Sequence, residues 1–121
     1  MKIFFLVFIL SLSFYFQKES RKYLVIQDVK YKNGKKLFEK NCLSCHSIDM
    51  KKKATAPALG GITKKREKKW LYDYTKDSYG MFEKEDKIAV EIKNQNWGLM
   101  PSFIELTDKD LDAIYYFIEN K

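Results

Sequence analysis

The five residues Cys42-Leu43-Ser44-Cys45-His46 constrain this 121-residue chain more than any other feature. They contain both of its cysteines and its one histidine. Residues three apart lie on the same face of a helical turn, so the two thiols would point the same way, and the histidine follows the second thiol directly. A spacing that uses every Cys and His of the chain predicts that the three side chains serve one chemical purpose.

Three kinds of site could explain this motif, and the alternatives to all three are a chance occurrence or a simple local disulfide. A redox dithiol is disfavoured because it usually follows a strand in a βαβ pattern, and nothing upstream of Cys42 has that pattern. Structural zinc needs four Cys or His ligands, and the chain has only three such residues. Haem c attachment uses C-x-x-C-H, with a thioether from each cysteine and the histidine on iron. We therefore predict that Cys42 and Cys45 hold one haem c and that His46 binds its iron.

The first 20 residues differ in character from the rest of the chain. Lys2 precedes an apolar run from Ile3 to Phe16, which is typical of an export signal. The run is shorter than the roughly 20 apolar residues that span a bilayer. We expect residues 1–20 to be a signal peptide or an N-terminal membrane anchor and residues 21–121 to form the functional domain. Its expected location is the periplasm, with anchoring to the outer face of the inner membrane as the alternative.

Composition limits the chain to a single modest core and suggests the charge of its partners. Apolar residues make up 45% and aromatic residues 16% of the sequence, enough for one domain. The net charge of +7 favours acidic partner surfaces. Nucleic acid is disfavoured as a partner because the basic residues are spread along the chain and no recognition motif occurs. Export would also separate the protein from nucleic acid.

Most of residues 30–120 resembles the small class I c-type cytochromes, which carry one haem. The segment "NGKKLFEKNCLSCH" is similar to the N-terminal helix of that family, and "APALGG" at 56–61 is similar to the loop after the histidine. The segment "GLMPSFIELTDKDLDAIYYFIEN" is similar to the distal methionine loop and the C-terminal helix. The resemblance implies an all-α fold of three to five helices wrapped around one covalently bound haem.

Three methionines are candidates for the sixth iron ligand. Met50 follows the histidine by four residues, too few to cross the ring plane when each residue spans at most about 3.6 Å. Met81 follows a predicted helix end at Gly80, where we expect packing or surface exposure. Met100 precedes Pro101, which fixes φ and removes a donor, in a stretch without helical periodicity. Together with the family pattern, this predicts a loop that holds the Met100 sulfur on iron.

The resemblance also assigns roles to residues near the haem. It implies that the Pro57 carbonyl accepts a hydrogen bond from Nδ1–H of His46, which would fix the ring tautomer; shaping a turn is an alternative role compatible with the first. Gly34, inside a predicted helix, costs about 1 kcal/mol relative to Ala. The resemblance explains it by a close helix crossing, in which Phe117 approaches the backbone and Phe38 packs beside it.

Two further features leave alternatives open. Trp97 lies just before the Met100 loop, where it would line the pocket or reach a haem propionate through its N–H; core packing alone is the alternative. The three consecutive lysines Lys51–Lys53 form either an ordinary solvated charge run or a docking patch for an acidic redox partner.

Apolar periodicity predicts about four helices. The first is expected over residues 29–44, a second within 63–79 and a shorter one within 83–94. The second would place Trp70, Leu71 and Tyr74 on one side. The last helix begins after Thr107, whose hydroxyl would cap it, with acidic residues at the positive end of its dipole. One face of this helix is apolar and contains Leu111, Ile114, Phe117 and Ile118.

These features predict a function. A haem iron held by histidine and methionine has no open position, so it transfers electrons. We predict a periplasmic monohaem carrier of one electron between respiratory or dehydrogenase partners, monomeric and not an enzyme, because no second histidine or paired carboxylates flank the motif. The alternatives are a haem sensor with a displaceable Met100 and a membrane-anchored cytochrome subunit of an oxidase or other periplasmic redox enzyme. Electron donor, acceptor and potential stay open.

Overall fold

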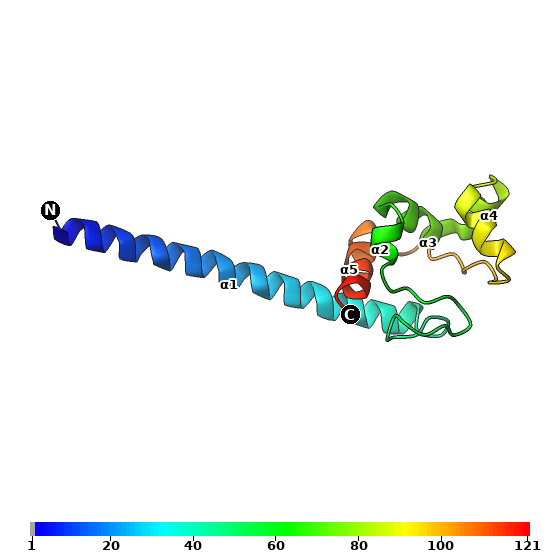
Figure 1. Ribbon diagram of the computed structural model, residues 1–121, viewed down its shortest axis with the longest axis horizontal. Coiled ribbons are helices and arrows are strands. Elements are labelled where there is room, and N and C mark those ends of the chain that lie inside the picture. The colour runs from blue at the N-terminus through cyan, green and yellow to red at the C-terminus, as the bar shows by residue number, and fades with distance from the viewer. Residues whose placement is uncertain (1) are drawn as a thin grey trace. The chain divides into compact units, whose positions relative to one another are not determined.

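The computed structural model describes the backbone of residues 2–121 and the side chains of residues 15–121. It contains five helices (Figure 1): α1 Lys2–Asn41, α2 Ile62–Lys65, α3 Lys68–Glu83, α4 Lys87–Asn94 and α5 Asp108–Glu119. Within these described residues there is no strand, which confirms the predicted all-α fold. The chain divides into two units, residues 1–30 and 31–121, and the second contains every predicted site residue.

Helix α1 begins far earlier than predicted, so the expected start at Val29 is wrong. Neither Gly nor Pro occurs between Lys2 and Asn33, so no residue there interrupts a helix. The side chains of residues 15–26 are all exposed, and an exposed helix needs no apolar periodicity. The predicted export segment covers residues 1–20, and the side chains of residues 1–14 lie outside the described part of the structure. Among the described residues, no helix has the length and apolarity that a bilayer crossing requires.

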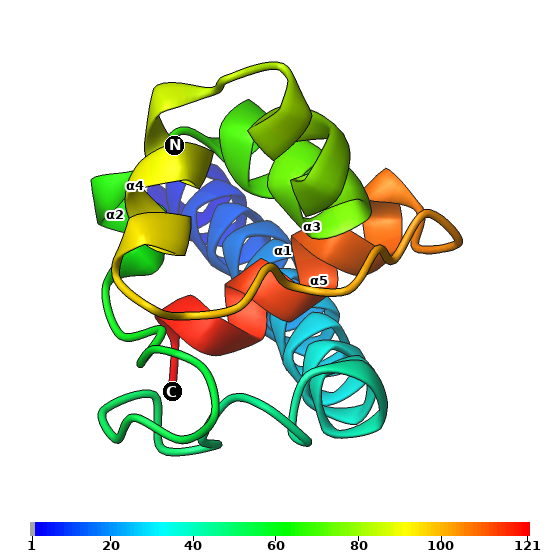
Figure 2. The ribbon, with the colours of Figure 1, turned by 90° about the vertical axis from the view of Figure 1, so that its right-hand side faces the viewer.

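The end of α1 crosses α5 at a glycine (Figure 2). A Cβ atom added to Gly34 would lie 1.9 Å from the carbonyl oxygen of Ala113 and 2.9 Å from Cβ of Phe117. The close crossing predicted at Gly34 is therefore present, although the backbone of Ala113 is nearer than the aromatic side chain. Phe38 packs beside it, with its ring centroid 5.5 Å from that of Phe117.

Helix α5 has the predicted start and the predicted buried face. Thr107 Oγ1 accepts a hydrogen bond from the Asp110 N–H at 3.2 Å, and Asp110 Oδ2 accepts from the Thr107 N–H at 3.0 Å. These reciprocal bonds satisfy two amide groups that a helix start leaves without partners. All four predicted face residues are buried, and they join the core cluster of Phe38, Met50, Leu71, Tyr72, Leu106, Leu111, Ile114, Phe117 and Ile118.

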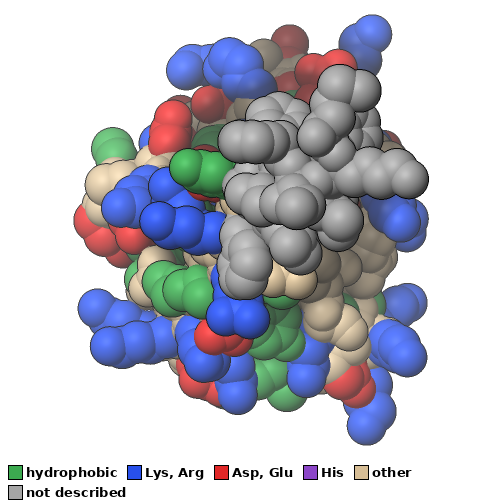
Figure 3. Space-filling model, turned by 90° about the vertical axis from the view of Figure 1, so that its left-hand side faces the viewer, with side chains coloured by type: hydrophobic (Ala, Val, Ile, Leu, Met, Phe, Trp, Pro, Cys, Tyr) green, Lys and Arg blue, Asp and Glu red, His purple; other side chains and the backbone are tan. Residues whose placement is uncertain are grey.

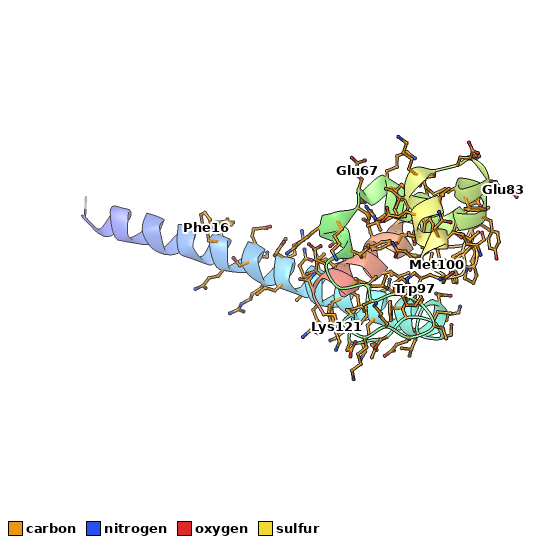
Figure 4. All side chains as sticks on the ribbon, turned by 45° about the vertical axis from the view of Figure 1, so that its right-hand side comes forward. Phe16, Glu67, Glu83, Trp97, Met100 and Lys121 are labelled. Atoms are coloured by element: carbon orange, nitrogen blue, oxygen red, sulfur yellow. The ribbon has the colours of Figure 1, made fainter. Side chains whose placement is uncertain are left out.

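The middle of the chain is more divided than predicted. The expected helix within 63–79 is two helices, because Arg66 adopts an extended conformation between α2 and α3. Helix α3 continues past the predicted end at Gly80, and Glu67 and Glu83 mark its two ends in Figure 4. It is interrupted at Asp77, whose φ of −153° and ψ of 71° are not helical. Helix α4 packs beside α3 (Figure 1) and is capped by Asp86, which accepts from two backbone N–H groups.

Candidate functional site

The C-x-x-C-H motif forms a hydrogen-bonded turn directly after α1. The carbonyl of Cys42 accepts from the N–H of Cys45 at 3.1 Å and from the N–H of His46 at 2.9 Å. Both cysteines are free thiols. The turn therefore presents two thiols and one imidazole from adjacent positions of a compact segment.

These three side chains line a cavity of about 360 Å³. A cavity of this size falls within the range of ligand and cofactor sites. The other walls come from the loop after the motif, from α2, α3 and α4, from the loop before α5 and from α5 itself. Much of the lining is apolar and includes Leu59, Ile62, Leu71, Ile92, Phe103, Ile114 and Ile118. Such a lining suits a large apolar ring and excludes water from it.

His46 is oriented by the loop that follows the motif. Its Nδ1 atom lies 2.9 Å from the carbonyl oxygen of Pro57, which is the contact predicted for this pair. A carbonyl oxygen only accepts, so Nδ1 carries the hydrogen and Nε2 keeps its lone pair. Burial lowers the pKa of His46, with the Pro57 hydrogen bond opposing that shift. The side chain is 8% exposed, and its neutral form, the form that binds metals, is favoured.

Of the three candidate methionines, Met100 is the one that the described structure places at the cavity. Trp97 lines the cavity from the same loop, and Figure 4 labels both side chains. Met50 is 3% exposed and packs in the core cluster instead. Met81 lies within α3, half-buried and away from the cavity lining. The loop from 97 to 103 is non-helical, as predicted.

Three other predicted residues stand apart from the cavity lining. Gly34, Phe38 and Phe117 form the crossing of α1 with α5 and do not contribute to its walls. Their place in the described structure is thus helix contact. They position the end of α1, from which the motif turn continues.

Sequence reasoning missed the polar residues of the cavity wall. Thr75 Oγ1 donates to the carbonyl of Leu71 at 2.8 Å and lies 2.7 Å from the hydroxyl of Tyr115. Burial raises the pKa of Tyr115 to about 12, so its hydroxyl stays protonated at neutral pH. A signal was available, because Tyr115 falls four residues after Leu111 and therefore borders the apolar face of α5.

The chemistry of these residues argues against the competing kinds of site. Burial raises the pKa of Cys42 to about 11, with Cys45 adding to the shift, whereas a redox dithiol depends on a lowered thiol pKa. Among the described residues, no group of three or more His, Cys, Asp or Glu side chains is arranged to hold a metal ion. Two free thiols, one imidazole with a free Nε2 and an apolar cavity fit a covalently attached haem.

Comparison with known proteins agrees with the interpretation of the cavity as a site for covalently attached haem. The sequence model of the family described as "Cytochrome c" matches residues 31–121. The chain belongs to the cytochrome c family. A stretch of 32 residues, 26% of this chain, is 50% identical to "Cytochrome c type-1" of Ascaris suum, of which it spans 29%. The fold is similar to that of "Cytochrome c from rhodothermus marinus", with a TM-score of 0.65, 21% identity and 75% of each chain covered.

Membership of this family establishes the cofactor and the general role. The protein is a c-type cytochrome that binds haem c, and Cys42 and Cys45 fit the motif through which that haem is attached. One such motif is present, so one haem is bound. Proteins of this family generally carry electrons rather than catalyse reactions.

Proposed function

We propose that this cytochrome is an exported carrier of single electrons whose haem iron is held by His46 and Met100. The observation that supports this proposal best is that both side chains line one cavity although they come from distant segments of the chain. The haem, when bound, supplies a one-electron iron couple, and methionine paired with histidine raises its reduction potential. If His46 and Met100 both hold the iron, no ligand position would be left for oxygen or substrate.

The chain's own residues prepare this site in distinct ways. The Pro57 carbonyl fixes the tautomer that leaves Nε2 of His46 available. Pro101 restricts the backbone just after Met100, which suits a loop that must hold a sulfur atom in place. We assign Trp97 to the pocket because it lines the cavity; an N–H contact from Trp97 to a propionate stays a prediction.

The expected partners are redox proteins with acidic surfaces. Lys51–Lys53 are all exposed, and Lys53 Nζ lies 5.8 Å from the ring of Trp97 at the cavity wall. Figure 3 shows Lys and Arg scattered among Asp and Glu over one face. We infer that Lys51–Lys53 mark the docking side, where charge would raise the rate of association more than the affinity.

The proposal includes export to the periplasm and electron exchange with a respiratory complex or a dehydrogenase. The charged Lys2 and the apolar run after it support export. Intact mass distinguishes the two forms. A periplasmic protein that lacks about the first 20 residues fits a cleaved signal, whereas a membrane-bound full-length chain fits an anchored subunit.

Carbon monoxide tests the carrier function against the sensor alternative. The reduced protein at neutral pH should bind carbon monoxide slowly and incompletely, because a firmly held methionine resists displacement. Met100→Ala is the matched control and should bind it rapidly and completely. Rapid, complete binding by the unaltered protein would contradict the carrier proposal and favour a sensor.

A further inference from the structure

The regular backbone of helix α3 is interrupted at Asp77, and the Asp77 side chain caps the part of the helix that follows. At Asp77 the backbone leaves the helical conformation, and the Asp77 Oδ1 atom accepts a hydrogen bond from the N–H of Gly80 at 2.9 Å. A Cβ atom at Gly80 would lie 2.1 Å from the other oxygen of this carboxylate. The second half of α3 therefore starts with its own N-cap, and Gly80 leaves room for it.

The interruption leaves carbonyl groups of α3 available to another segment. In an unbroken helix the N–H of Gly80 would bond to the carbonyl of Lys76, four residues earlier. Here that carbonyl accepts from the hydroxyl of Ser102, and the next carbonyl upstream, of Thr75, accepts from the N–H of Phe103 at 3.2 Å. Both donors lie in the loop directly after Met100.

A third bond joins the interruption to Met100 itself. Ser78 has no exposed surface, and its hydroxyl donates to the carbonyl oxygen of Met100 at 2.5 Å. A buried hydroxyl with this partner is costly to leave unpaired. Three hydrogen bonds thus tie residues 100–103 to residues 75–78 of α3.

We propose that the interruption of α3 at Asp77 is a docking site for the Met100 loop and that Ser78 is the positioning residue that keeps the Met100 sulfur in place. The inference rests on the proposed function, because it concerns Met100 as an iron ligand. If displacement of Met100 by another ligand moves its backbone, the bond to Ser78 breaks. The hydroxyl therefore opposes any ligand that competes with Met100.

The test compares two hydroxyl deletions in α3 of the haem-loaded protein. Ser78→Ala removes the bond to the loop. Tyr72→Phe is the control, because the Tyr72 hydroxyl donates to Asp112 of α5 and Tyr72 does not line the cavity. Imidazole affinity of the ferric protein reports the competition with Met100, and thermal unfolding reports general stability. Ser78→Ala should bind imidazole about threefold to tenfold more tightly than the unaltered protein, while Tyr72→Phe should bind it as the unaltered protein does.

Several outcomes would overturn this inference. Unchanged imidazole affinity in Ser78→Ala, or an equal increase in Tyr72→Phe, would mean that the hydroxyl contributes only to stability. If Ser78→Ala does not fold, Ser102→Ala decides the question: Ser102 is exposed, and its loss should tighten imidazole binding about twofold to threefold. No change in Ser102→Ala would then refute the docking site.

Met100→Ala separates this failure from failure of the proposed function. Suppose that Met100→Ala binds imidazole far more tightly than the unaltered protein, while the serine variants bind it with the affinity of the unaltered protein. Met100 is then a ligand, and the docking site alone is wrong. If Met100→Ala binds imidazole as the unaltered protein does, Met100 is not the ligand, and both proposals fall together.

Discussion

Gly34 of α1 faces the carbonyl of Ala113 in α5 so closely that a Cβ atom would lie 1.9 Å from its oxygen. Because the obstructing atoms are backbone, α5 would have to shift as a whole to admit even one methyl group. This contact sets the position of the end of α1, from which the haem-attachment turn continues.

Gly34→Ala should therefore lower the free energy of unfolding by about 3 kcal/mol, the upper part of the range for overpacked sites. Lys36→Ala is the control, since it introduces the same residue, alanine, at an exposed position of the same helix. Denaturant unfolding of the haem-loaded proteins measures both. A Gly34→Ala protein as stable as the control would show that the helices separate without cost.

The start of α5 offers a second test of local structure. Thr107→Ala removes the hydroxyl that accepts from the Asp110 N–H and should cost about 1 kcal/mol of unfolding free energy. Thr107→Ser keeps the hydroxyl and should retain most of that stability. Equal losses in the two variants would show that the methyl group matters and the cap does not.

Asp49 should make stability depend on pH in the acid range. Backbone N–H groups of Lys52 and Lys51, together with the Ser47 hydroxyl, lower the pKa of Asp49 to about 2. A folded-state pKa below the unfolded value near 4 gives stability that is present above pH 4 and is lost as pH falls toward 2. Asp49→Asn should be less stable than the unaltered protein at neutral pH and should match it near pH 2. A difference that is constant with pH would contradict this account.

Loss of both thiols should remove the haem and, with it, the fold. In the double variant Cys42→Ala with Cys45→Ala, we expect no covalent haem and a largely unfolded chain, because residues of the small core, Leu71, Ile114 and Ile118, line the cavity that the haem would fill. Circular dichroism after expression with a haem-attachment system measures the helix content. Native-like helicity without haem would show that the protein folds around an empty cavity.

The parts of the structure that the sequence predicts are those that local chemistry determines. The C-x-x-C-H spacing, the capped start and apolar face of α5, and the choice of Met100 over Met50 follow from short segments. Gly34 was a useful signal because glycine inside a helix usually requires a close neighbour. Its nearest partner, Ala113, was not predicted because a backbone carbonyl has no sequence signature.

The parts that were missed depend on distant segments or on the absence of a pattern. The interruption of α3 at Asp77 is stabilised by bonds to Ser102 and Phe103, well beyond any local window. The side chains of residues 15–26 in α1 are exposed, so no apolar periodicity indicates a helix there. The break at Arg66 between α2 and α3 contains no glycine or proline from which it could have been predicted.

The most direct test of the central claim is the visible spectrum of the purified protein before and after acid–acetone extraction. Haem that resists extraction, together with the weak far-red ferric band of methionine sulfur on iron, is the result that this account predicts. Resistant haem without that band would contradict ligation by Met100 and the carrier function built on it. Extractable haem would contradict attachment through Cys42 and Cys45.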